Sequence, residues 1–428
     1  MLVSNSRASL VEPMHLLFIS SLLPADAPAS GFEIANRAII EEYRRQGVRL
    51  TFAGFRRPGS APARAGEIDL GELPIENAAV GRGKKTSWLV RAMARGLPVS
   101  AAKLAVLSPK ALRARLAEAG PVDGYVLNSI QMPTAYPFLV GDRPSVFIAH
   151  NVEQRSAAEN ARTARSRGAR LLYRREAKLL GKAEAAVCAA AAVVHTLSVD
   201  DRAALGLGTD TRCHPLALSI GRPLVPDDGR RSQDVGLIGT WSWAPNRAGL
   251  DWFIEEVVPH LPADLSIAIA GRFDGKPPKT PANVRFAGRV DDAQAFVRGS
   301  RVIALATKGG TGVQLKTIET FEEGLPAVAT SAALRGVDRL PENVRVAEDP
   351  ADFAAALLDS VAGERRGSVL RTSGFGFMLA QRQALSAGVR AGLADLARAL
   401  APPGDAQGIS IAPDEADSVH PPLGVARG

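Results

Sequence analysis

Residues 308–330 read KGGTGVQLKTIETFEEGLPAVAT, and this stretch decides the fold. The apolar run VIALA precedes it, three glycines make a turn, and a stretch with helical periodicity then leads to Gly324-Leu325-Pro326 and a second apolar run. A strand, a glycine-rich turn, a helix and another strand form one unit of a parallel α/β fold. Glycines let backbone N–H groups approach a ligand closely, and the helix N-terminus that follows favours an anion such as a diphosphate.

The predicted helix carries two side chains suited to a nucleotide. At about 100° per residue, Lys316 and Glu319 lie on the same face as Gly312. Lys316 would neutralise phosphate charge, and Glu319 would accept hydrogen bonds from ribose hydroxyls. An ordinary amphipathic helix with a Lys–Glu pair three residues apart has the same pattern. The pattern alone therefore leaves a nucleotide site and a structural helix both open.

The alternation of short apolar runs and longer amphipathic stretches extends along most of the 428 residues. It produces two series of predicted strands, joined by a segment rich in Pro and Gly. The fold class that we predict is α/β, with two Rossmann-like domains facing across a cleft. The predicted divisions are a leader (1–13), an N-terminal domain (14–215), a linker (216–233), a C-terminal domain (234–375), a terminal helix (376–402) and a disordered tail (403–428).

Composition narrows the class of protein further. Hydrophobic residues make up 46% of the chain, which excludes a wholly disordered or collagen-like protein. Cys188 and Cys213 are too few for a disulfide framework and lack zinc-site spacing, so a reducing cytoplasm is expected. The run 14–24, MHLLFISSLLP, is too short to span a bilayer and lacks the basic start of a signal peptide. We predict a buried first strand there.

The net charge of +8 is unevenly distributed. Residues 1–200 hold 27 Lys and Arg against 17 Asp and Glu, whereas the rest hold 25 against 27. The basic residues concentrate in 82–95 (RGKKTSWLVRAMAR), which has the mixture typical of an interfacial helix, and in 154–182. An anionic membrane surface would attract both stretches; a solvated arginine-rich face is the alternative. Nucleic acid is not expected, because no known nucleic-acid-binding motif occurs.

The segment GTGVQLKTIETFEEGLPAVAT resembles the donor-site segment of family 4 glycosyltransferases, whose motif reads G-(S/T)-G-x-x-x-K-x-x-E and then G-x-P-V-V-x-T. The resemblance continues in VGLIGTWSWAPNRAGLDWFIEEVVPHL (235–261) and in FIAHNVEQRSAAEN (147–160), and it spans roughly residues 14–375. It implies the GT-B fold, a donor nucleotide held mainly by the C-terminal domain, and sugar transfer with retention of configuration and without a metal. Asp200-Asp201 and Asp291-Asp292 are accordingly interpreted as helix caps.

The resemblance also implies roles for single residues. Glu319 matches the ribose-binding second glutamate of the family's E-x7-E motif, but the first glutamate falls on Thr311, where the donor sugar would meet a hydroxyl or the backbone. Arg272 and Lys316 would hold the diphosphate, although a solvated arginine is the alternative for Arg272. The donor-binding residues implied in full are Gly310, Thr311, Gly312, Val313, Glu319, Arg289 and Val290.

His150 follows a predicted strand at the carboxyl edge of the first sheet, where ligands bind in parallel α/β folds. It resembles the family histidine beside the donor sugar and acceptor, with a structural histidine as the alternative. The predicted catalytic residues are thus His150, Lys316 and Arg272. The predicted acceptor-side residues are Gly31, Asn151 and Glu153.

These features predict a metal-independent hexosyltransferase in exopolysaccharide or other cell-surface polysaccharide biosynthesis. A UDP- or GDP-sugar would be its substrate, with no separate cofactor, and a glycan or lipid-linked glycan its acceptor. We expect a cytoplasmic protein, peripheral on the inner face of the plasma membrane. Two alternatives stay open: a nucleotide-sugar epimerase or hydrolase of the same fold, and a degenerate, non-catalytic scaffold, which Thr311 in place of glutamate favours.

Overall fold

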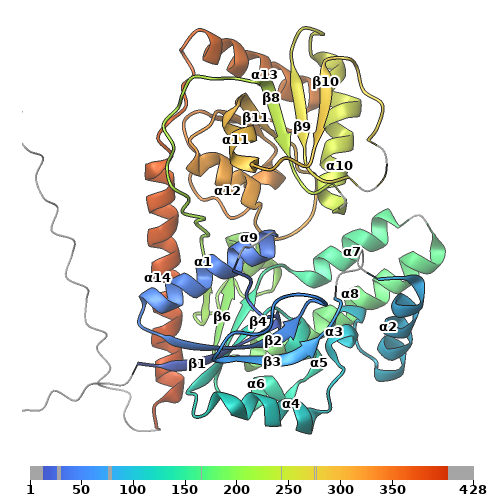
Figure 1. Ribbon diagram of the computed structural model, residues 1–428, viewed down its shortest axis with the longest axis vertical. Helices are drawn as coiled ribbons and strands as arrows, with labels where there is room; N and C mark the ends of the chain where they lie inside the picture. Colours follow the sequence, from blue (N-terminus) through green and yellow to red (C-terminus); the bar gives the residue numbers. More distant parts are fainter. Residues whose placement is uncertain are drawn as a thin grey trace, which may run out of the picture.

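The computed structural model describes residues 13–26, 30–75, 80–164, 166–241, 243–273, 275 and 277–402. The predicted tail, and the predicted leader apart from residue 13, lie outside these ranges. Two parallel sheets with interleaved helices form the two halves of the molecule, and both halves have the predicted Rossmann-like construction (Figure 1).

The first sheet has seven strands in the order β3-β2-β1-β4-β5-β6-β7, with every neighbouring pair parallel. Its central strands are buried almost throughout, as expected for a parallel sheet covered by helices on both faces. The strands are β1 (His15–Leu22), β2 (Arg49–Arg56), β3 (Glu67–Glu72), β4 (Gly124–Asn128), β5 (Ser145–Ala149), β6 (Val193–Thr196) and β7 (Cys213–Pro215). The helices are α1 (Gly31–Arg45), α2 (Arg82–Arg95), α3 (Val99–Leu104), α4 (Pro109–Leu116), η2 (Ala117–Ala119), α5 (Gln131–Ala135), α6 (Phe138–Gly141), α7 (Glu153–Thr163), α8 (Arg167–Ala190) and α9 (Val199–Ala204).

The second sheet has six parallel strands in the order β10-β9-β8-β11-β12-β13. The order reverses between β8 and β11, as it does between β1 and β4 in the first sheet, and ligands bind at such switch points. The strands are β8 (Gln233–Ile238), β9 (Ile267–Ala270), β10 (Val284–Gly288), β11 (Ser300–Leu305), β12 (Ala327–Ala329) and β13 (Val344–Val346). The helices are α10 (Ala244–Trp252), η3 (Phe253–Val257), η4 (Val258–His260), α11 (Ala293–Arg298), α12 (Leu315–Glu322), η5 (Ser331–Leu334), α13 (Pro350–Arg365) and α14 (Phe375–Leu400).

The terminal helix α14 returns to the first domain, which the sequence did not predict. In Figure 1 it runs alongside the first sheet, and one hydrophobic cluster joins Leu385 and Val389 of α14 to Leu16 of β1. Two glycines make this close packing possible: a Cβ added at Gly392 would lie 2.7 Å from His195 Nε2, and the Cβ added at Gly388 would lie 2.8 Å from Leu216 Cδ2. The first domain therefore includes the C-terminal helix.

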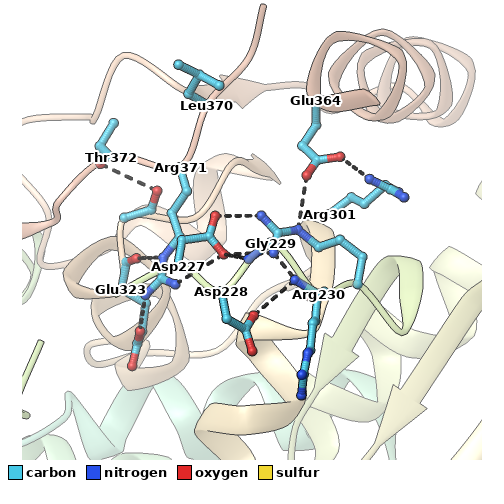
Figure 2. Close-up of polar contacts among 12 residues, drawn as sticks. Asp227, Asp228, Gly229, Arg230, Arg301, Glu323, Glu364, Leu370, Arg371 and Thr372 are labelled. Atoms are coloured by element: carbon cyan, nitrogen blue, oxygen red, sulfur yellow. Dashed lines mark hydrogen bonds and ion pairs between the residues drawn. The ribbon is translucent and has the colours of Figure 1, made fainter. Parts of the chain in front are cut away.

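Two segments cross between the domains, residues 216–232 and 366–374, and we call them the crossing segments. Both are bonded to α12 or to the residue after it. Glu322 accepts hydrogen bonds from Ser219 Oγ (2.8 Å) and from the backbone N–H groups of residues 220 and 221 (both 2.9 Å). Arg371 of the second segment bonds Glu323 Oε2 (2.8 Å) and the carbonyl of Val225 (3.1 Å). Figure 2 shows Arg371 between Glu323 and Asp227. The predicted linker is therefore bonded both to the second domain and to the other crossing segment, residues 366–374.

Candidate functional site

The glycine turn between β11 and α12 has the backbone that only glycine adopts easily. The φ angles of Gly309, Gly310 and Gly312 are 74°, 82° and 74°, in the left-handed region. Arg335, which follows η5, braces the turn by donating to the carbonyls of Gly312 (3.1 Å) and Gly309 (2.9 Å). Arg335 was not predicted as a site residue, although it follows β12 at the carboxyl edge of the sheet, where ligands bind in parallel α/β folds.

Lys316 lies in the first turn of α12, half-buried at the switch point between β8 and β11. Its Nζ donates to Asn246 Oδ1 of α10 at 3.2 Å, and in the described part of the chain it forms no ion pair. Burial, reinforced by the positive charge of Arg335, lowers the pKa of Lys316 to about 8. An ammonium group with one neutral partner beside a helix N-terminus is suited to a diphosphate.

Glu319 lies one helical turn further along the same face. Its Oε1 accepts hydrogen bonds from Arg222 Nη2 of the first crossing segment (2.7 Å) and from Gln294 Nε2 of α11 (3.3 Å). Burial raises the pKa of the carboxyl group, and the charge of Arg222 opposes this shift. Both partners use Oε1, so Oε2 stays available for the ribose hydroxyls that the resemblance implies. Neither Arg222 nor Gln294 was predicted.

His150 is 5% exposed and belongs to a buried polar network at the edge of the first sheet. Its Nε2 lies 2.7 Å from Asn128 Oδ1, and Asn128 Nδ2 donates to Ser20 Oγ and Asn36 Oδ1, both at 3.1 Å. Because the Asn128 amide nitrogen is engaged elsewhere, its oxygen faces the histidine, which places the imidazole proton on Nε2. Burial lowers the pKa of His150 to about 3, so the ring is neutral and its Nδ1 is an acceptor.

The two domains touch at the glycine turn, so the predicted cleft is closed at this point. A Cβ added at Gly312 would lie 2.0 Å from Asn151 Oδ1, the residue after His150. The Cβ added at Gly31, the first residue of α1, would lie 3.3 Å from Leu315 Cδ1. The structure thus brings residues predicted from both halves of the chain, Gly31 and Asn151 from one and Gly312 from the other, to one junction, where α12 lies over α1 (Figure 1).

The remaining predicted residues lie around this junction. Arg272 follows β9 and Arg289 follows β10, and both are exposed at the carboxyl ends of their strands; Val290 is half-buried beside Arg289. Val313 packs on Gly336, where an added Cβ would lie 2.5 Å from Val313 Cγ2. Glu153 begins α7, and burial raises its pKa while a hydrogen bond from Asn151 opposes the shift.

Of the two acidic pairs interpreted as helix caps, one prediction is right and one is wrong. Asp292 is the N-cap of α11 and accepts from the N–H groups of residues 294 (2.8 Å) and 295 (2.9 Å). The N-cap of α9 is instead Ser198, because its hydroxyl reaches the Asp201 N–H at 3.0 Å. Asp201 is 2% exposed and accepts a hydrogen bond from the Gly312 N–H of the other domain.

Within the described ranges, no three His, Cys, Asp or Glu side chains gather as a metal site would require. None of the described helices is long and apolar enough to cross a bilayer.

Residues 232–362 match the family model described as Glycosyl transferases group 1. No curated protein matches the chain significantly in sequence. Among solved structures, a sucrose-phosphate synthase from Thermosynechococcus elongatus aligns with a TM-score of 0.61 at 16% identity, covering 90% of this chain and 100% of that chain. HepE from Anabaena, in complex with UDP and glucose, aligns with a TM-score of 0.55 at 12% identity, covering 90% and 99%. WaaG, a glycosyltransferase involved in lipopolysaccharide biosynthesis, aligns with a TM-score of 0.50 at 14% identity, covering 90% and 98%.

At these identities the structural similarities establish the fold, which is GT-B, as predicted. The match to the group 1 glycosyl transferases lies within the second domain. The resemblance to family 4 glycosyltransferases that the sequence predicts is thereby confirmed.

Proposed function

We propose that the protein transfers a hexose from a UDP- or GDP-sugar to a glycan or lipid-linked glycan, with retention of configuration, in the synthesis of exopolysaccharide or another cell-surface polysaccharide. The main support for this proposal is the arrangement of two charged side chains, Lys316 and Glu319, near the start of α12. Within the described part of the chain, the half-buried Lys316 is hydrogen bonded to one neutral partner, Asn246, and the protein donors to Glu319 use one of its two carboxylate oxygens. A cation and a carboxylate one turn apart match the diphosphate and ribose of a nucleotide.

Stabilisation of the leaving group would supply most of the catalysis. In sugar transfer the bond from the anomeric carbon to the β-phosphate oxygen breaks, and the departing diphosphate gains negative charge. Lys316, Arg272 and the first N–H groups of α12 would neutralise that charge, as preorganised donors do in a site with little water. With two cations and a helix N-terminus at hand, we propose that the reaction needs no metal ion.

His150 would position the reacting sugar by hydrogen bonding. Because its pKa is about 3, it is uncharged at neutral pH and acts through Nδ1 as an acceptor, while Asn128 holds Nε2–H. The acceptor hydroxyl would form the new bond to the anomeric carbon, and its proton would pass to an oxygen of the departing phosphate. Asn151 and Gly31, which contribute to the junction beside this ring, would line the acceptor side.

We also propose that α2 and α8 rest on an anionic membrane surface on the cytoplasmic side. The helices are neighbours, since Arg175 of α8 donates to the Ala92 carbonyl of α2 at 2.9 Å. Apolar side chains protrude from both: Val90 is 62% and Leu171 is 71% exposed. Such residues among Lys and Arg are typical of interfacial helices. Trp88 belongs to the stretch 82–95 that was predicted to be interfacial, but its side chain is buried and lies outside this surface.

A thermal-shift screen against UDP, GDP and a panel of their sugars tests the function, followed by a transfer assay with the best donor. HepE has UDP and glucose bound in its structure, which makes UDP the first nucleotide to test. We expect binding and transfer, and we expect Lys316→Ala to lose both while staying folded. Binding with only hydrolysis or epimerisation of the donor would favour those reactions, and no binding of UDP or GDP would favour a scaffold.

A flotation assay with vesicles tests the membrane proposal separately. We expect the protein to float with vesicles containing phosphatidylglycerol and not with phosphatidylcholine alone, and the double variant Val90→Asp, Leu171→Asp to stay unbound. Equal binding to both vesicles, or none, would show that the basic surface has no membrane role.

A further inference from the structure

Helix α7 of the first domain reaches the glycine turn of the second domain with two side chains. Glu159 Oε2 accepts a hydrogen bond from the Gly310 N–H at 2.8 Å, and Ser156 Oγ lies 2.6 Å from Thr311 Oγ1. Residues three apart share a face of a helix. One face of α7 therefore meets two consecutive residues of the turn that was assigned to the donor.

The second oxygen of Glu159 is available to a ligand. Two arginines lie near the carboxylate. Arg162 Nη2 is 3.9 Å from Oε1 on a side chain that is 78% exposed, and such a contact is weak in water. Arg335 also interacts with the charge of Glu159, while its guanidinium is hydrogen bonded to the carbonyls of Gly309 and Gly312. The Glu159 side chain is itself 30% exposed. As in Glu319, one oxygen is fixed by the protein and the other can accept from a hydroxyl.

The position of α7 is set by a buried carboxylate of α8. Glu184 accepts hydrogen bonds from the N–H groups of Glu153 (2.6 Å) and Gln154 (3.2 Å), the first two residues of α7. This contact supplies acceptors for N–H groups that a helix start leaves unsatisfied. Glu159 thus projects from a helix anchored within the first domain, and it arrives at the turn only when the domains meet.

The charges around the turn show which part of a donor fits there. Besides Glu159 at Gly310, Asp201 accepts from the Gly312 N–H, and Asp201 Oδ2 is buried without a hydrogen-bond partner in the described chain. The Arg335 guanidinium, which donates to the carbonyls of Gly309 and Gly312, balances part of this negative charge. The N–H groups that would hold a phosphate are nevertheless already bonded to the carboxylates of Glu159 and Asp201, which disfavour a diphosphate at this point. The diphosphate therefore belongs at Lys316, and the turn is left for the uncharged part of the donor, its sugar.

We infer that Glu159 recognises the sugar that is transferred, with Oε1 accepting hydrogen bonds from its hydroxyl groups. This inference rests on the proposed function, and it assigns the predicted donor contacts of Gly310 and Gly312 to the sugar and not to the phosphate. It also gives Thr311 a role: its hydroxyl meets Ser156, and the carboxylate for the sugar comes from the opposite domain.

Calorimetry with a nucleoside diphosphate and its sugar tests the inference, with UDP and UDP-glucose as first probes and GDP and GDP-mannose as second. The variants are Glu159→Ala and Glu159→Gln, and Glu256→Gln is the matched control because that carboxylate is exposed in the second domain. We expect Glu159→Ala to weaken binding of the nucleotide-sugar about tenfold or more, while binding of the bare diphosphate changes by less than about threefold. Glu159→Gln should fall between, and thermal melting should be unchanged.

Three results would overturn the inference. Tighter binding of both probes by Glu159→Ala would identify the carboxylate as a blocking anion in the diphosphate site. An unchanged ratio of the two affinities would leave Glu159 a structural contact between domains. Failure of the unaltered protein to bind either pair of probes would instead refute the proposed function, and the inference with it.

Discussion

Replacing Lys316 with methionine should make the protein more stable and unable to bind its donor. The side chain is half-buried, is hydrogen bonded to Asn246 and has no ion pair in the described chain. Methionine keeps the length and flexibility of the side chain and removes its charge. The variant therefore separates the energetic cost of the charge from its use in binding.

The magnitude follows from the pKa of Lys316, which burial lowers from 10.5 to about 8. At about 1.4 kcal/mol per pKa unit, keeping this ammonium charged in the folded protein at pH 7 costs about 3 kcal/mol. Loss of the bond to Asn246 offsets about 1 kcal/mol of the gain. We expect Lys316→Met to raise the free energy of unfolding at pH 7 by about 1–2 kcal/mol.

The pH dependence provides a second measure of the same effect. The unfolded chain binds more protons than the folded one between pH 8 and 10.5, so the penalty from Lys316 is complete below pH 8 and is relieved as the pH rises through this window. About 2 kcal/mol of the penalty is relieved between pH 7 and pH 10, so the stability advantage of the variant should disappear or reverse by pH 10.

Urea unfolding followed by circular dichroism measures the stability, and calorimetry with UDP measures binding. Lys110→Met, at an exposed lysine of α4, is the control and should change neither quantity. If Lys316→Met is less stable than the unaltered protein at pH 7, the buried ammonium group of Lys316 does not destabilise the fold, and this reasoning is wrong. Unchanged affinity for UDP would refute its role in the site.

Three further changes test the site and its surroundings. UDP affinity should fall up to about tenfold per pH unit above pH 8 as Lys316 loses its proton, and Lys316→Arg should abolish this slope in calorimetry. Glu322→Ala should lower the free energy of unfolding by about 3–5 kcal/mol in urea titrations, because it leaves Ser219 and two backbone N–H groups without their acceptor. Gly312→Ala should cut turnover by about tenfold or more in transfer assays, because its Cβ would lie 2.0 Å from Asn151 Oδ1 and hold the domains apart.

Each of these has a decisive control. The same slope above pH 8 in Lys316→Arg would trace it to the ligand and not to the lysine. Glu322→Gln, which keeps one acceptor oxygen, should cost less than Glu322→Ala, and equal costs would contradict the hydrogen-bond account. The double variant Gly312→Ala, Asn151→Ala should regain part of the turnover; if it does not, the collision with Asn151 is not the cause.

Much of the fold was predictable because parallel sheets bury their strands on both faces, which leaves short apolar runs in the sequence. Strands β3 and β7 escaped prediction for the converse reason. In the run EIDLGE of β3, at an edge of the sheet, half-buried and buried positions alternate and the last two residues are exposed; β7 has three residues. Neither leaves a continuous apolar run. The amphipathic pattern of α2 predicted a helix but did not show which face packs against the domain. The burial of Trp88 was therefore not predicted.

Some residues of the candidate site were likewise predictable from the sequence, and others were not. The turn and Lys316 stand in one contiguous motif, so the sequence shows them together. The partners Arg222 and Glu159 lie 97 and 151 residues away from the residues they bond, Glu319 and Gly310. Such contacts depend on how two domains meet, and no local periodicity records that arrangement.

Both crossing segments are hydrogen bonded to α12 or to the residue after it, and this limits how the second domain can be exchanged with that of a related enzyme. The matched span, residues 232–362, omits Ser219, Arg371 and all of α14. A chimera that exchanges only this span would place the carboxylates of Glu322 and Glu323 against foreign crossing segments without their donors. We therefore expect a chimera to exchange donor preference only when residues 216–232 and 366–374 are exchanged together with the second domain. Helix α14 should stay with the first domain.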